Sequence, residues 1–107
     1  MKILPEDGLQ QFDQYGHAPI HFVQSCKMLE ILINHGIDID TKTQDKASVT
    51  LLQLSIKSGN NEVRDCLLEA KANIEIEDSH KRTPIVNCIE EQDPECVKKI
   101  LPLVDNK

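Results

Sequence analysis

The chain has 107 residues, of which 12 are basic and 18 acidic, and its formal net charge is −6. This length suffices for one domain with a buried core, and a hydrophobic content of 39% argues against a disordered tail. The acidic balance is opposite to the basic surface that a nucleic-acid footprint needs, so direct nucleic-acid binding is not expected. The sequence has no run of 18 apolar residues and no apolar secretory segment at its start, so neither membrane insertion nor secretion is expected.

A segment of similar pattern occurs three times along the chain. The copies begin at Asp13, Asp45 and Asp78, which are 32 and 33 residues apart, and each continues through two stretches with helical apolar spacing. A single pair of short helices cannot bury both of its faces, so the three copies are expected to stack on one another.

Residues 1–12 precede the first copy and are shorter than one copy. Pro5 to Gly8 predict a turn, and Leu9 and Phe12 are expected to cover the exposed end of the first copy as an N-terminal cap. A frayed terminus is the alternative interpretation.

In the first copy, Pro19 suits the first turn of a helix, where its missing N–H costs nothing. Apolar residues from Met28 to Ile33 predict a second helix, and Gly36 suits the position just after its end. The interval from His21 to Gly36 is short compared with the other copies. We therefore expect a tightened turn around Gln24–Cys26 between the two helices.

The second and third copies are more regular. Thr50 and Thr83 are expected to cap the N-termini of the first helices, and Gly59–Asn60 fits the turn between the helices of the second copy. In the third copy Pro94 is acceptable at a helix start, whereas Pro102 is expected to end or kink the last helix.

These copies resemble the ankyrin repeat, which has a period of about 33 residues and a T-P-L-H-x-A signature after a β-turn. Ala18–His21, Thr50–Gln53 and Thr83–Val86 stand at the signature, although the second and third copies lack its histidine. Gly36–Asp40 and Lys71–Glu75 stand where the family has its turn between repeats. The resemblance implies an all-α fold, a short α-solenoid of helix–turn–helix repeats with β-turn fingers.

The expected organisation is a single domain over residues 1–107. Its parts are an N-terminal cap (1–12), repeat one (13–44), repeat two (45–77), and repeat three with a C-terminal cap (78–107).

The sequence contains no motif for phosphate, dinucleotide or zinc-protease chemistry, and no nucleophile elbow, so we expect no enzyme, catalytic residue or cofactor. The resemblance gives His21 the role of bonding backbone between repeats, and His35 is expected to bond the last carbonyls of the preceding helix.

The four cysteines are Cys26, Cys66, Cys88 and Cys96. They form no C-x-x-C pair and no histidine pair accompanies them, so no metal site is expected. We expect free thiols in a reducing compartment, with Cys88 and Cys96 packed in the core and Cys26 the most exposed.

The family's fingers and first helices line a concave groove, and matching positions give the candidate partner-binding residues. These are Tyr15, His17, Phe22, Gln44, Lys46, Val49, Leu54, Lys57, His80, Arg82, Asn87, Glu90 and Glu91. Tyr15, Phe22 and Leu54 are expected to form its apolar centre, because aromatic residues are favoured interface anchors. Inward packing of Phe22 and Leu54 is the alternative.

The resemblance thus predicts a non-catalytic protein–protein interaction module, an adaptor or scaffold subunit that binds a protein of unidentified nature. A small inhibitor that occludes an enzyme or a transcription factor is the alternative, and a thiol- or metal-handling protein is a remote one. The expected location is cytoplasmic, with the nucleus as the alternative. Weak self-association through exposed end caps also stays open.

Overall fold

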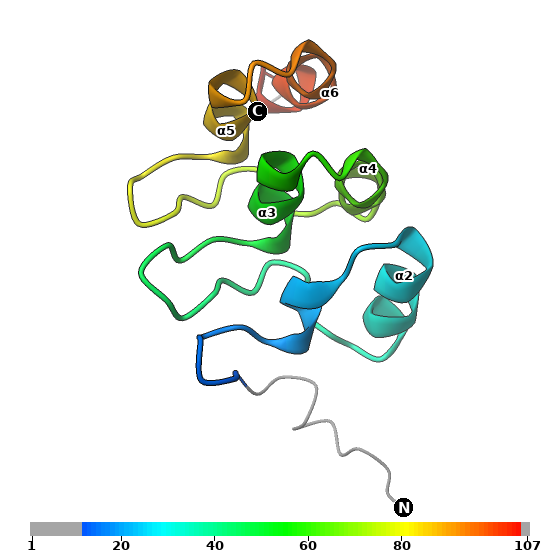
Figure 1. Ribbon diagram of the computed structural model, residues 1–107. Helices are drawn as coiled ribbons and strands as arrows, with labels where there is room; N and C mark the ends of the chain where they lie inside the picture. The colour runs from blue at the N-terminus through cyan, green and yellow to red at the C-terminus, as the bar shows by residue number, and fades with distance from the viewer. Residues whose placement is uncertain (1–11, 106–107) are drawn as a thin grey trace, which may run out of the picture.

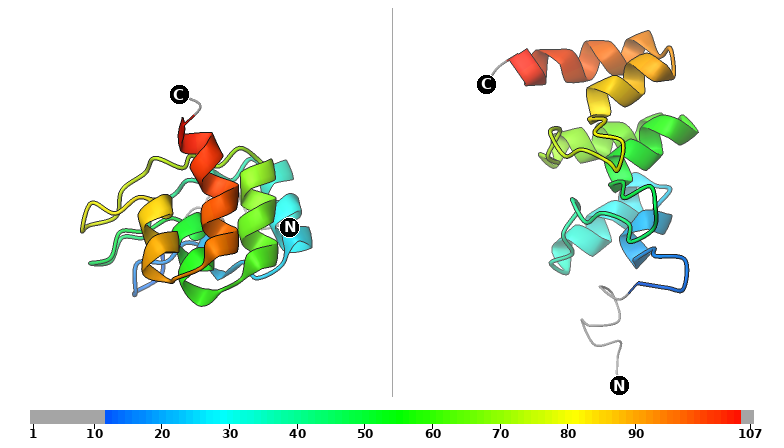
Figure 2. Two further views of the ribbon diagram at one scale, coloured as in Figure 1. Left: turned by 90° about the horizontal axis from the view of Figure 1, so that it is seen from above. Right: turned by 90° about the vertical axis from the view of Figure 1, so that its left-hand side faces the viewer.

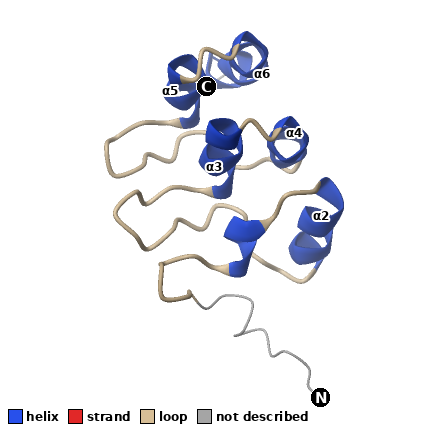
Figure 3. Cartoon of the chain, in the orientation of Figure 1, coloured by secondary structure: helices blue, strands red, loops and turns tan. Residues whose placement is uncertain are grey.

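The computed structural model describes residues 12–105. Over this range the chain forms one 3₁₀ helix and five α-helices, and no strand (Figure 3): η1 (Pro19–Phe22), α2 (Cys26–Asn34), α3 (Leu51–Ser58), α4 (Asn61–Glu69), α5 (Pro84–Glu90) and α6 (Pro94–Asp105). The helices stand in three successive pairs stacked along one axis (Figure 1). The expected all-α solenoid of three repeats is confirmed.

The two helices of each pair belong to two separate rows. Seen along the stack, α2, α4 and α6 form an outer row, while η1, α3 and α5 form an inner row next to the projecting loops (Figure 2). These loops are the fingers, here defined as residues 12–18, 35–50 and 70–83. The inner row and the fingers therefore share one side of the molecule.

Side chains at the helix starts explain where most helices begin. Ser25, Thr50 and Asn60 each accept the backbone N–H of the residue three positions further on, which satisfies one free donor of the first turn. Thr83 occupies the expected capping position, but its side chain makes no such bond. Pro84 follows it as the first helical residue and needs no partner for an N–H.

The interior of the stack is built from aliphatic side chains of both rows. Leu29, Leu52, Val63, Leu67 and Ile100 are buried almost completely. They belong to α2, α3, α4 and α6, so one continuous core joins the three pairs. No pair could bury this surface alone.

Repeat one differs from the expectation in where it is short. Three residues, Val23–Ser25, connect η1 to α2, so the turn between the helices is not tightened. The first helix has instead shrunk to the single 3₁₀ turn η1. The expected N-terminal cap falls on residues outside the described range, except Phe12. Phe12 is partly buried, with its ring 6.3 Å from that of His21.

Of the two expected effects of Pro102, an end or a kink of the last helix, the structure rules out the end. The helix α6 starts at Pro94, as predicted, but continues past Pro102 to Asp105. Pro102 has no N–H and cannot donate to the carbonyl of Lys98. Because Lys98 is exposed, this carbonyl lies on the solvent-facing side of the helix.

The expectation of free thiols is wrong. Two disulfides, Cys26–Cys66 and Cys88–Cys96, use all four cysteines. The two cysteines of the first bridge are far apart in the sequence, so their pairing was not predicted. Stacking brings the start of α2 against α4 of the next repeat. The second bridge joins α5 to α6, and both of its residues are fully buried, as their predicted packing role requires.

Neighbouring fingers are joined by backbone hydrogen bonds. The N–H of Gln44 donates to the carbonyl of Gly16 at 2.7 Å, and that of Ser79 donates to Ala47 at 3.0 Å. Gly16 has φ +84°, and a Cβ there would stand 2.7 Å from the backbone carbon of Gln44. Only glycine therefore permits the first two fingers to approach this closely.

Replacing Gly16 with alanine should open the contact between the first two fingers. Gly16→Ala incurs both the positive φ and a clash with backbone, so we expect a loss of at least about 2 kcal/mol in unfolding free energy. Gly36→Ala is the matched control: its φ is +86° but nothing lies within 4 Å, so only about 1 kcal/mol should be lost. Urea unfolding measures both, and equal losses would contradict the account.

Candidate protein-binding surface

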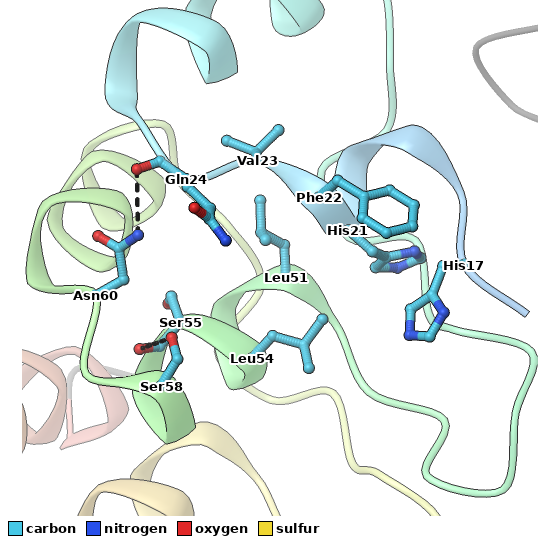
Figure 4. A pocket seen from close by; sticks show the side chains of 10 residues that line it. All are labelled: His17, His21, Phe22, Val23, Gln24, Leu51, Leu54, Ser55, Ser58 and Asn60. Atoms are coloured by element: carbon cyan, nitrogen blue, oxygen red, sulfur yellow. Dashed lines mark hydrogen bonds between the residues drawn. The ribbon is translucent and has the colours of Figure 1, made fainter. Parts of the chain in front are cut away.

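A hollow of about 240 Å³ opens between η1 and α3 on the inner side of the stack (Figure 4). Repeat one contributes His17, His21, Phe22, Val23 and Gln24 to its wall. Repeat two contributes Leu51, Leu54, Ser55, Ser58 and Asn60. The hollow is therefore a joint product of two repeats and depends on how they are stacked.

Three predicted residues meet at this hollow. His17 and Phe22 lie next to one another, with ring centroids 5.6 Å apart, and Leu54 faces them from α3. The Phe22 side chain is 62% exposed, so it does not pack inward, and Leu54 is half-buried. Tyr15 is 67% exposed on the first finger. One exposed aromatic ring, that of Phe22, thus lies in the wall of the hollow.

Most of the residues that repeat two contributes to the hollow were not among the predicted partner-binding residues. Leu51, Leu54, Ser55 and Ser58 are spaced i, i+3, i+4 and i+7, so they share one face of α3. This helix face could have been predicted from the sequence once the helix was assigned to these residues. At its far end Asn60 donates from Nδ2 to the carbonyl of Gln24 at 3.2 Å, which closes the polar end of the hollow.

His21 holds the wall of the hollow to the second finger. Its Nδ1 accepts the N–H of Ala18 at 2.9 Å, so the ring proton is on Nε2, which lies 2.9 Å from the carbonyl oxygen of Thr41. His21 thus bonds backbone as expected, and the bond joins η1 to the second finger within residues 13–44. His35 likewise bonds the carbonyl of Ile31 at 2.9 Å, as expected.

Gln53 makes a comparable pair of bonds one repeat further on, although its second acceptor lies at a different position of the finger. Its Oε1 accepts the N–H of Thr50 at 3.2 Å, and its Nε2 donates to the carbonyl of Arg82 at 2.7 Å. The amide of glutamine thus replaces the imidazole of the signature without loss of either contact. Val86, at the third equivalent position, has no group that could make them.

Burial lowers the pKa of His21, because the charged imidazolium would lose its hydration. The Thr41 carbonyl and Asp45 act in the opposite direction, while His17 adds to the lowering. His21 is therefore neutral at neutral pH, as the bond from Ala18 requires.

Carboxylates flank the mouth of the hollow beside His17. Asp13 and Asp45 each place an oxygen 3.9 Å from a ring nitrogen of His17. A hydrogen bond from the N–H of His17 lowers the pKa of Asp13, and one from the Thr43 hydroxyl lowers that of Asp45. Both remain ionised near neutral pH, which gives this edge a negative potential.

Two predicted residues are inaccessible to a partner. Val49 is 2% exposed and Asn87 is 1% exposed. Val49 pairs with Thr43 across the second finger through its carbonyl, and Asn87 accepts a bond from Gln53 between repeats two and three. Val49 and Asn87 therefore stabilise the fold, because the fingers and the first helices also pack against neighbouring elements.

The remaining predicted residues lie outside the hollow. Arg82 is half-buried and engaged within the chain, with Nη1 3.1 Å from Glu90 and Nε 3.2 Å from Asp78. The hydrogen bond to Glu90 raises the pKa of Arg82. The other five residues are exposed along the fingers and the ends of the first helices: Gln44, Lys46, Lys57, His80 and Glu91.

A family model for ankyrin repeats, in three copies, matches residues 23–107. The chain belongs to the ankyrin-repeat family. No curated protein matches it. Members of this family are protein–protein interaction modules and are in general not catalytic. Within the described range, no helix has both the length and the apolar character needed to cross a bilayer.

The neutral state of His21 should make stability depend on pH in a specific interval. In the unfolded chain His21 takes up a proton near the ordinary histidine pKa of about 6.5, whereas in the folded chain its pKa is lower. The free energy of unfolding is therefore highest above that pH and decreases as the pH is lowered. His21→Gln should keep both hydrogen bonds, as Gln53 does, and show a smaller loss between pH 7 and 5.

The measurement is the urea midpoint of both proteins across this pH range. The lowered pKa values of Asp13, Asp45, Asp65 and Asp78 act only at more acidic pH and are common to both proteins. Parallel curves from pH 7 to 5 would show that His21 does not carry the effect.

Proposed function

We propose that the chain is a non-catalytic adaptor or scaffold subunit that binds a protein through its first two fingers and the hollow between η1 and α3. The observation that supports this most is the exposed aromatic side chain of Phe22 in the wall of the hollow, together with the exposed Tyr15 on the first finger. Exposed aromatic residues beside a pocket are a common arrangement at interface hot spots.

The lining of the hollow indicates the kind of segment that would enter it. Leu51, Leu54 and Val23 favour one apolar side chain, while Ser58 and Gln24 offer hydrogen bonds to the backbone of the incoming segment. Lys46 and Lys57 are exposed nearby, whereas Asp13 and Asp45 are negative at the other edge. These charges would set the orientation and association rate of the partner.

An inhibitor that occludes an enzyme or transcription factor uses the same surface and remains the alternative. The two roles differ in whether the bound partner keeps its activity. We place the protein in the cytoplasm, with the nucleus as the alternative.

Weak self-association belongs to the same proposal. Ile89 in α5 is 55% exposed, whereas Ile56, its counterpart 33 residues earlier, is 3% exposed. Ile56 belongs to the buried core, whereas Ile89 belongs to α5, a helix of the pair at the C-terminal end of the stack (Figure 1). This apolar end supports contact between copies.

The experiment is photo-crosslinking from position 22, in a native lysate, with a photoreactive phenylalanine analogue replacing Phe22. One protein should be crosslinked, and adding unlabelled wild-type protein should compete for it. The Tyr15→Ala/Phe22→Ala variant should compete at least about tenfold less well, since each anchor is worth more than about 1 kcal/mol.

The matched control is Met28→Ala/Ile31→Ala, which removes two exposed apolar side chains of similar exposure from the outer row. It should compete as the wild type does, and circular dichroism should show equal helix content for all variants. Equal competition by the two double variants would move the binding surface away from the hollow. The partner's activity, assayed with and without this chain, then distinguishes adaptor from inhibitor.

A further inference from the structure

The carboxylate of Glu30 lies beside the Cys26–Cys66 disulfide, although a disulfide does not require a carboxylate. The Oε2 atom of Glu30 is 3.8 Å from the Sγ of Cys26, and donor atoms of Cys26, Glu30 and Cys66 all lie within 4.8 Å of one another. Among residues 12–105 no other group of three cysteine, histidine or acidic side chains is arranged this closely. The bridge is half-buried, so small ions can reach it.

Helix geometry holds these donors in place. Cys26 and Glu30 are four residues apart on α2, and Glu62 and Cys66 are four residues apart on α4, so each pair shares one helix face. The carboxylate of Glu62 accepts the N–H of Cys26 at 3.0 Å, which fixes the start of α2 against α4. The two helices therefore hold the two cysteine sulfurs and the Glu30 carboxylate close together.

The spacing suits a tetrahedral soft metal ion. With zinc–sulfur and zinc–oxygen bonds of about 2.3 and 2.0 Å, a ligand sulfur and oxygen are about 3.5 Å apart, and two sulfurs about 3.8 Å apart. Glu30 is already near this distance from Cys26. Only the two sulfurs must separate, and breaking the bond between them permits that.

We propose that Cys26, Cys66 and Glu30 bind a zinc-class divalent cation once the disulfide has been reduced. A small thiol reductant supplies two electrons, is itself oxidised to its disulfide, and leaves Cys26 and Cys66 as thiols. The cation then binds both sulfurs as thiolates, releases their two protons to water, and takes one oxygen of Glu30 and a water molecule as its other ligands. A cation also offsets the repulsion among three negative donors.

The site offers two alternative ways of joining repeats one and two. In the oxidised chain a covalent bond joins α2 to α4, and in the reduced chain the cation does so. The inference is independent of the proposed function, because it concerns the outer row and not the hollow.

The experiment titrates Co²⁺, as a coloured stand-in for zinc, into the full chain kept reduced by a phosphine without oxygen. We expect thiolate-to-cobalt charge-transfer absorption that saturates at one equivalent and is removed by Zn²⁺. Cys26→Ser/Cys66→Ser should abolish it, and Glu30→Gln should weaken binding at least about tenfold. Cys88→Ser/Cys96→Ser, which removes the other pair, should leave it unchanged.

A second measurement needs no variant. In the reduced wild-type chain, Zn²⁺ should slow alkylation of Cys26 and Cys66 by iodoacetamide, as located by peptide mass spectrometry. Absence of charge-transfer absorption together with unprotected Cys26 and Cys66 would overturn the proposal. So would absorption that follows Cys88 and Cys96 instead.

Discussion

The shape of the inner side depends on one contact that is made twice. In repeats one and two, a side chain of the first helix accepts the N–H at the start of its own helix and donates to a backbone carbonyl of the next finger. His21 does this with an imidazole and Gln53 with an amide. Because the contact joins a first helix to the next finger, it fixes the angle at which that finger leaves the stack. Phe22 and Leu54 face one hollow only when that angle is kept.

Repeat one is held by several such links, and its first helix is the shortest of the three. Its first helix is one 3₁₀ turn and cannot supply the apolar face that α3 and α5 supply. Three links hold it in the stack: Gly16 to Gln44 between the first two fingers, His21 to Thr41 between η1 and the second finger, and Cys26 to Cys66 between α2 and α4. Cross-links thus replace packing at this end of the stack. The hollow sits where these links are densest, so binding and the stability of repeat one are expected to be coupled.

Much of the fold was predictable because the repeat period places each pattern on an element. The prolines at positions 19, 84 and 94, Thr50 and Gly59 mark helix ends by local chemistry and needed no tertiary information. What the sequence concealed is contact between repeats. Cys26 and Cys66 are distant in sequence and adjacent in the stack, and Val49 and Asn87 match surface positions yet are buried against neighbouring elements. Pro102 shows the converse, since a residue that can end a helix lies within α6.

The ring of His21 tests the account most directly. Two-dimensional nitrogen–proton correlation of the histidine rings, followed from pH 8 to 5, reports both tautomer and titration. The account predicts a neutral ring with its proton on Nε2, Nδ1 acting as acceptor, and a midpoint below the ordinary value of about 6.5. A proton on Nδ1, or titration at the ordinary value, would mean that the link from η1 to the second finger does not exist. The hollow could then not be a fixed feature of the protein.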